Sequence, residues 1–162
     1  MLVGPMGVGK TTIGKKLAKR LGCSFVDTDQ LFVAEHGAIS EFFETKGEAA
    51  FRELEENYVA RAIATDVVVA TGGGAVLSSK TRTLLGQAFV VYLATDGRHM
   101  SSRLSGGGRP LLKNGLQDWR RIYENRKPLY REVANLEIDT SSMPLAAIIG
   151  AITEGLQADE RF

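Results

Sequence analysis

The sequence predicts an α/β protein in which helices cover both faces of a parallel β-sheet, giving three layers. Short apolar runs alternate along the chain with segments whose apolar residues recur at helical spacing. The runs are apolar at nearly every position, which is typical of strands buried on both faces. A glycine-rich loop joins the first run to the first helical segment. The alternation therefore indicates a single α/β/α domain.

Five strands are expected, in order, at residues 1–3, 24–26, 67–70, 88–93 and 136–138. Helices are expected at residues 13–21, 51–62, 96–103 and 117–133, and Pro144 is well placed to open a last one. Gly22 should end the first helix as its C-terminal cap. Asp96 should begin the third as its N-terminal cap.

Length and composition exclude several classes of protein. The 162 residues fit one domain, residues 1–162. Lys and Arg total 20 against 19 Asp and Glu, so no basic excess indicates a nucleic-acid partner or an anionic membrane surface. The longest apolar runs fall far short of the ~20 residues that cross a bilayer. A single cysteine, Cys23, cannot form an internal disulfide, which fits a cytoplasmic location.

A phosphate-binding loop stands directly after the first strand. Residues 4–11 read Gly-Pro-Met-Gly-Val-Gly-Lys-Thr and match the pattern G-x-x-x-x-G-K-[ST]. In such a loop the backbone N–H groups and the start of the following helix surround the phosphates. Lys10 is expected to bridge the β- and γ-phosphates, Thr11 to ligate Mg²⁺, and Thr12 to donate to phosphate. The expected ATP-binding residues of the loop are Gly7, Val8, Gly9, Lys10, Thr11 and Thr12.

A phosphate loop alone does not decide between a small-molecule kinase and a GTPase-type switch. A guanine-specific switch would ordinarily carry an Asn-Lys-x-Asp element after a late strand. Residues 94–97 read Ala-Thr-Asp-Gly and residues 139–141 read Asp-Thr-Ser, so neither strand end supplies it. The sequence therefore favours the kinase.

Two carboxylates follow the second strand, at Asp27 and Asp29. The carboxyl ends of parallel strands lie beside the phosphate site, and residues two apart on an extended segment point the same way. Asp27 is therefore expected to hold Mg²⁺ through water and Asp29 to meet an acceptor hydroxyl. The plainer alternative is that Asp29 caps a helix and Asp27 is solvated.

Four further motifs follow the loop in order. They are Phe-Arg-Glu-Leu-Glu at 51–55, three glycines at 72–74, Arg-Pro-Leu-Leu at 109–112 and Pro-Leu-Tyr-Arg at 128–131. With the phosphate loop, this set closely resembles the shikimate kinase family, from Leu2 to about Pro144. The resemblance implies a phosphate-loop kinase fold with strand order 2-3-1-4-5. It also implies the substrate, since the spacing of the motifs alone indicates no more than a small-molecule kinase.

The resemblance implies transfer of the γ-phosphoryl group of ATP to the 3-hydroxyl of shikimate, in the route to chorismate and aromatic amino acids. Asp29 would contact the reacting hydroxyl as base or orienter. Arg52 and Arg131 resemble the family's carboxylate clamp, which suits the bidentate preference of guanidinium for a planar anion. Gly72, Gly73 and Gly74 would complete the pocket, chiefly through the Gly73 N–H.

On the nucleotide side, Arg109 resembles the lid arginine that reaches the γ-phosphate, and Arg103 the residue that lies against adenine. Ser141 and Ser142 stand where the family often has an adenine-side arginine. A substrate-binding segment at about 29–61 and a lid at about 105–115 are expected to move relative to the core. The protein is expected to act as a monomer with Mg²⁺.

Two alternatives stay open at this stage. A related phosphate-loop kinase could act on another small polyol acid, such as gluconate. A binding module that transfers no phosphate is the non-enzyme alternative. Only the shape and charges of the acceptor pocket separate the two kinases.

Overall fold

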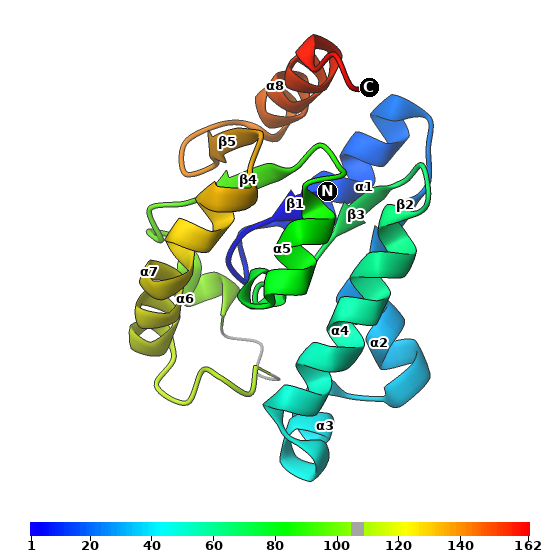
Figure 1. Cartoon of the computed structure of the whole chain (residues 1–162). Helices are drawn as coiled ribbons and strands as arrows, with labels where there is room; N and C mark the ends of the chain where they lie inside the picture. Colours follow the sequence, from blue (N-terminus) through cyan, green and yellow to red (C-terminus); the bar gives the residue numbers. More distant parts are fainter. Residues whose placement is uncertain (105–108) are drawn as a thin grey trace.

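The computed structural model describes residues 1–104 and 109–162 and forms one five-stranded sheet flanked by helices (Figure 1). The strands are β1 (Leu2–Val3), β2 (Phe25–Asp27), β3 (Val68–Ala70), β4 (Val91–Ala94) and β5 (Leu136–Asp139). The helices are α1 (Lys10–Leu21), α2 (Thr28–His36), α3 (Ile39–Lys46), α4 (Glu48–Ile63), the 3₁₀ helix η1 (Ala75–Leu77), α5 (Ser79–Leu85), α6 (Met100–Arg103), α7 (Leu116–Val133) and α8 (Leu145–Ala158).

The sheet has the order β2-β3-β1-β4-β5, and every neighbouring pair is parallel. The predicted fold class and strand order are therefore confirmed. Because all strands run the same way, their carboxyl ends meet at one edge. The phosphate loop, Asp27, the glycine turn after β3 and the loop after β4 all begin at that edge.

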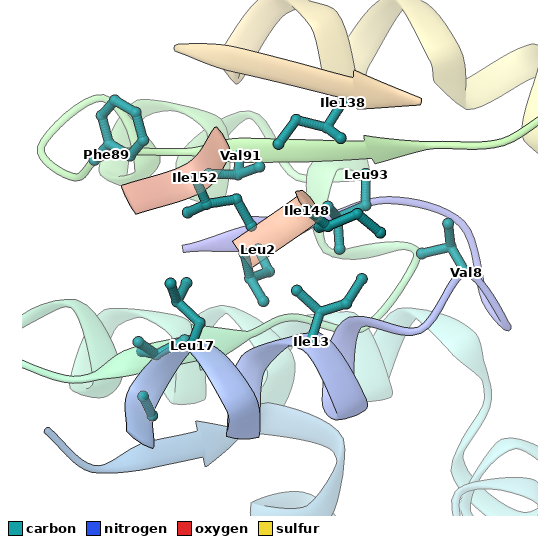
Figure 2. Close-up of a cluster of buried hydrophobic side chains, with 12 residues drawn as sticks. Leu2, Val8, Ile13, Leu17, Phe89, Val91, Leu93, Ile138, Ile148 and Ile152 are labelled. Atoms are coloured by element: carbon teal, nitrogen blue, oxygen red, sulfur yellow. The ribbon is translucent and has the colours of Figure 1, made fainter. Parts of the chain in front are cut away.

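Successive strand residues face opposite layers, as the pleat requires. Leu2 packs with α1 and α8, whereas Val3 packs with α5 and α7. The first of these cores contains Ile13 and Leu17 of α1 and Ile148 and Ile152 of α8 against the sheet (Figure 2). Burial on both faces explains why the strands read as continuous apolar runs.

A third, separate apolar cluster lies within the predicted substrate-binding segment. Phe32 of α2 packs on Phe51 and Tyr58 of α4, with Ile39 and Phe42 of α3 against them. Ring centroids of Phe32 and Phe51 are 4.9 Å apart in an edge-on arrangement. Helices α2, α3 and α4 therefore form a unit with its own small core beside the sheet (Figure 1).

Two of the differences from the expected boundaries concern β4 and α6. Strand β4 begins at Val91 rather than at residue 88; before it, the Val90 N–H donates to the side-chain oxygen of Asn135, and the Val90 carbonyl accepts from the N–H groups of Asn135 and Leu136. Asp96 does not cap the third helix, which begins at Met100 with His99 before it. The Asp96 carboxylate instead binds the backbone and guanidinium of Arg98, and Gly97 turns the chain with a φ of 82°.

The predicted C-terminal cap of α1 is confirmed, since Gly22 adopts a left-handed conformation there. Of the predicted lid, residues 105–108 lie outside the described residues, whereas 109–115 lie between α6 and α7. Within the described ranges, none of the helices combines the length and the apolar character that a membrane crossing needs.

Candidate active site

The phosphate loop curls between β1 and α1, and two glycines allow its path. Gly9 stands at the start of α1 with a φ of 106°, which side chains rarely tolerate. Gly4 lies so close to β4 that a Cβ there would come within 2.6 Å of the Leu93 carbonyl oxygen. No side chain caps α1, so its first N–H groups remain available to an anion.

The side chain of Lys10 turns back onto the phosphate loop. Its ammonium group donates to the carbonyl oxygens of Gly4 at 2.8 Å and Pro5 at 2.9 Å. Burial lowers the pKa of Lys10 to about 8, against the opposing effect of Asp29 and Asp27. Burial thus disfavours the charged form of Lys10 until an anion binds beside it.

Thr11 and Asp27 meet at the mouth of the loop. The Thr11 hydroxyl donates to Asp27 Oδ2 at 2.7 Å, which joins α1 to the end of β2. Asp27 Oδ1 accepts from the backbone N–H groups of Asp29 and Gln30 and so caps α2. Asp27 is therefore the N-terminal cap of α2, and Asp29 lies in the first turn of that helix. The prediction that both carboxylates stand on one extended segment and point the same way is wrong.

The donors at this point fit Mg²⁺. A hydroxyl and one carboxylate beside a phosphate loop supply what Mg²⁺ takes from protein when phosphates and water supply the rest. The described residues contain no cluster of three or more His, Cys, Asp or Glu side chains suited to a metal ion. Thr11 and Asp27 could therefore form a Mg²⁺ site whose remaining ligands are water and the phosphates of a bound nucleotide.

A cavity of about 730 Å³ extends from the phosphate loop over the start of α8. Its lining includes Arg103 and Arg109 and also Thr140, Met143 and Leu145. Ser141 and Ser142, which stand where the family often has an adenine-side arginine, are not among its lining residues, whereas the apolar side chains of Met143 and Leu145 are. Sequence reasoning missed these two because isolated apolar residues near a helix start carry no signal of ligand contact.

The two arginines differ in their contacts. Arg103 donates to the Gly7 carbonyl oxygen at 3.2 Å and so lies against the loop. Arg109 donates to the carbonyl oxygens of Leu104 and Arg103, each at 3.4 Å. Arg109 lines both the phosphate cavity and a second, smaller cavity beside it.

The second cavity, of about 170 Å³, opens between the glycine turn and helices α2, α4 and α7. Its polar lining comes from Asp29, Arg52, Glu55, the three glycines 72–74, Arg109 and Arg126. Apolar side chains form the rest of the wall, including Ile39, Phe43, Phe51 and Leu111. Asp29 and Gly73 line both cavities, so the two are adjacent at these residues.

Asp29 is the carboxylate at the junction. Burial raises its pKa, and the neighbouring Asp27 raises it further, against the lowering effects of Lys10 and Arg52. A carboxylate held in this way is more basic than an exposed one. Asp29 is thus suited to accept a proton from a hydroxyl group placed between the two cavities.

Arg52 stands on α4 where the sequence predicted it. Its guanidinium forms ion pairs with Glu55 at 2.8 Å and Glu48 at 3.3 Å. Within the described residues, Arg52 Nε and Glu55 Oε2 are buried without a hydrogen-bond partner. Unpaired buried polar atoms are costly, and their position at the cavity indicates that a polar ligand completes them.

Arg131 is not brought to this cavity. It lies exposed near the end of α7 and pairs with Glu137 at 3.2 Å. The α7 arginine that lines the cavity is Arg126, which is 6% exposed. No carboxylate in the described part of the chain lies within ion-pair distance of Arg126, and burial lowers its pKa. A buried guanidinium without a carboxylate partner indicates an anionic ligand.

The helical spacing of α7 could have found Arg126. Trp119, Tyr123, Arg126 and Tyr130 are the members of one buried stripe. The spacings of four, three and four residues place all of them on one face of the helix. Arg131 lies outside that stripe, and only the local motif around it drew attention.

The glycine turn packs against both charged groups. A Cβ at Gly72 would come within 2.6 Å of Glu55 Oε2 and 2.8 Å of Asp29 Oδ1, and a Cβ at Gly74 would collide with the Arg52 guanidinium. The Gly72 N–H donates to Thr28 Oγ1, whereas the N–H groups of Gly73 and Gly74 donate to no partner in the described residues. These two N–H groups are therefore available to a ligand in the cavity.

Comparison with known proteins gives a consistent result. The family model for shikimate kinase matches residues 6–157. A shikimate kinase from Streptomyces coelicolor is 42% identical over 164 residues, covering 99% of this chain and 96% of that relative. A solved shikimate kinase from Acinetobacter baumannii, in complex with shikimate, superposes with a TM-score of 0.92 at 36% identity, covering 98% of this chain and 92% of that one.

A gluconokinase from Sinorhizobium meliloti also superposes, with a TM-score of 0.65 at 22% identity over 96% of this chain and 90% of its own. At that identity the likeness concerns the fold alone. The shared fold explains why the phosphate loop by itself could not separate the two kinds of kinase.

Proposed function

The chain belongs to the shikimate kinase family, and we infer from this that it transfers the γ-phosphoryl group of ATP to the 3-hydroxyl of shikimate. The products are shikimate 3-phosphate and ADP, in the route to chorismate and aromatic amino acids. The observation that carries the acceptor assignment is the pair of guanidinium groups, of half-buried Arg52 and buried Arg126, in a small cavity adjacent to the phosphate loop. A planar carboxylate is the anion that such a pair favours.

We propose that Arg52 and Arg126 bind the carboxylate of shikimate, together with the free N–H groups of Gly73 and Gly74. Arg126 here replaces Arg131 of the sequence prediction. The ring would lie against the apolar wall that includes Phe43 and Phe51. Gly72 leaves room beside Asp29 and Glu55 that a side chain would occupy.

Asp29 is proposed to act on the reacting hydroxyl. The oxygen of that hydroxyl forms the new bond to the γ-phosphorus as the bond from phosphorus to the leaving oxygen of ADP breaks. Its proton passes to the carboxylate of Asp29, which burial has made more basic than usual. Phosphoryl transfer depends mainly on positioning and charge neutralisation, so holding this hydroxyl in line is the larger part of the role.

Cations on the phosphate side complete the site. Lys10 is proposed to leave the Gly4 and Pro5 carbonyl oxygens for the β- and γ-phosphates. Arg109, which lines both cavities, is placed to neutralise charge on the transferring group. Gly7, Val8, Gly9 and Thr12 are proposed to donate to the phosphates, and Arg103 to lie against adenine opposite Met143.

We propose that Thr11 and Asp27 hold Mg²⁺, with Asp27 acting through water. When bound, Mg²⁺ supplies a positive charge that neutralises the phosphate oxygens. The existing hydrogen bond between the two side chains already holds them within 2.7 Å of one another.

We also propose a monomer that acts in the cytoplasm without a nucleic-acid partner. The residues proposed to bind ATP and the acceptor all belong to this chain, so the proposed reaction needs no residue from a second copy. The near balance of 20 basic and 19 acidic residues gives no electrostatic reason to bind nucleic acid. Residues 29–61, with their own apolar cluster, are proposed to move as one unit on acceptor binding.

The test is ADP release with ATP and Mg²⁺ in the presence of shikimate, gluconate, nucleoside monophosphates or no acceptor. Strong stimulation is expected with shikimate alone. Equal stimulation by gluconate would break the acceptor assignment. No stimulation by any acceptor would favour a binding module that transfers no phosphate.

A further inference from the structure

Tyr130 lies beneath the second cavity without lining it. It is 1% exposed, and its ring stacks on that of Tyr92 with centroids 5.2 Å apart. Its hydroxyl donates to the Gly73 carbonyl oxygen at 2.5 Å. Arg126, one helical turn earlier on the same buried face of α7, reaches the same glycine turn: one of its guanidinium nitrogens lies 3.7 Å from the place that a Cβ on Gly73 would take. The Tyr130 hydroxyl and an arginine of the cavity thus meet the same glycine turn.

The direction of the hydrogen bond to Gly73 is fixed by chemistry. A carbonyl oxygen accepts only, so the Tyr130 hydroxyl donates to it. Burial raises the pKa of Tyr130 to about 12, which keeps the hydroxyl protonated at working pH. The donor of this bond is therefore always present.

This bond bears on the acceptor cavity, because Gly73 lines it together with Arg126. The bond holds the carbonyl of Gly73. In a planar trans peptide the next N–H, that of Gly74, points the opposite way. Holding the carbonyl therefore also sets the direction of a free donor.

We propose that Tyr130 is a positioning residue for the acceptor carboxylate, holding the Gly73–Gly74 peptide, beside Arg126, in the orientation that binds it. The proposal deepens the proposed function and rests on it. Tyr130 itself contacts no substrate. Its effect should therefore appear in the binding of a carboxylate and not in the binding of ATP.

A neighbouring hydroxyl supplies a matched control. The Tyr92 hydroxyl is buried in the same aromatic cluster and bonds to the Tyr123 hydroxyl at 2.6 Å. Neither tyrosine lines the second cavity. Removing the Tyr92 hydroxyl makes the same chemical change in the same packing without reaching Arg126 or the glycine turn.

The experiment measures dissociation constants of Tyr130→Phe for shikimate, for shikimate methyl ester and for ATP. Shikimate should bind about tenfold more weakly, the size of one hydrogen bond to a charged group. The ester, which lacks the negative charge, and ATP should each change by less than about twofold. Turnover at saturating shikimate should be kept within about threefold. Tyr92→Phe should leave all three affinities unchanged, whatever its melting temperature.

Equal losses for shikimate and its ester, or the same loss in Tyr92→Phe, would overturn the proposal. So would unchanged shikimate binding in Tyr130→Phe. If wild type neither binds nor phosphorylates shikimate, the proposed function fails as well; if only the Tyr130 variant behaves as wild type, this inference alone fails.

Discussion

The phosphate loop and the acceptor cavity are built in different ways. The loop is one stretch, residues 4–11, and most of its donors are backbone N–H groups at the start of α1. The acceptor cavity takes single side chains from α2, α4 and α7 and a turn after β3. In the loop the path of the backbone makes the site, so few side chains matter. In the cavity the direction of each side chain matters, and tertiary packing decides it.

The regions also differ in how they carry charge. Lys10 is partly satisfied by two carbonyl oxygens of its own loop. Arg52 is paired with two glutamates, whereas Arg126 has no carboxylate partner in the described part of the chain. Asp29 stands where the two regions meet. Substitutions at the junction, in the cavity and in the loop should therefore have separable effects on rate, acceptor binding and nucleotide binding.

The largest effect is expected at the junction, for Asp29→Asn. The amide keeps the shape of the side chain but removes the anion that accepts the hydroxyl proton. Turnover at saturation should fall by about 10² to 10⁴, the range typical of acid–base groups. Dissociation constants for shikimate and ATP should change far less. Full turnover in this variant would show that Asp29 neither accepts the proton nor orients the hydroxyl.

The next effect separates the two arginines of α7. Removing one partner of a buried, hydrogen-bonded charge pair costs ~2 to 5 kcal/mol, or roughly 30-fold to several thousand-fold in affinity. Arg126→Ala should weaken shikimate binding by that range and leave ATP binding nearly intact. Arg131→Ala removes an exposed pair with Glu137 and should change shikimate binding less than about threefold.

Titration of both variants with shikimate and with ATP checks this pair, with melting temperatures to confirm that each is folded. The reverse order, with Arg131→Ala the weaker binder, would restore the assignment made from the sequence. Equal losses of shikimate and ATP binding in Arg126→Ala would mean that the cavity and the loop are not independent.

The same contrast explains which features the sequence could predict. Gly9, Lys10 and Thr11 are consecutive, and the loop conformation that uses them is local, so their pattern alone indicates their place. Arg126 and Arg131 are five residues apart, which at 3.6 residues per turn is about 140° around α7. The short motif near Arg131 carried no information about which way that side chain points. The buried stripe through Trp119, Tyr123 and Tyr130 did, because it shows which face of the helix meets the core.

The layers were predictable for a similar reason, whereas the strand order was predicted from the resemblance to the family. Continuous apolar runs such as residues 67–70 report burial on both faces, and burial is a property of each run by itself. The nucleotide end was not predictable in detail. Met143 and Leu145 reach the cavity only because α8 begins at the same sheet edge, and nothing in their local sequence indicates it.

The smallest effect is a pH dependence of ATP binding, and it belongs to the loop. Burial lowers the pKa of Lys10 to about 8, so the ammonium is charged at pH 7 and mostly neutral at pH 9. If ATP binds the charged form, its dissociation constant should rise by about tenfold between those pH values, since binding must then take up a proton. Isothermal titration at several pH values measures this rise. Lys10→Arg keeps its charge throughout, so its ATP affinity, even if lower, should be nearly flat with pH. A slope that survives in Lys10→Arg would belong to a group other than Lys10. An equal ATP affinity at pH 7 and pH 9 in the wild-type protein would mean that the buried ammonium does not titrate in this range, and that the loop is as insensitive to pH as the arginines of the acceptor cavity.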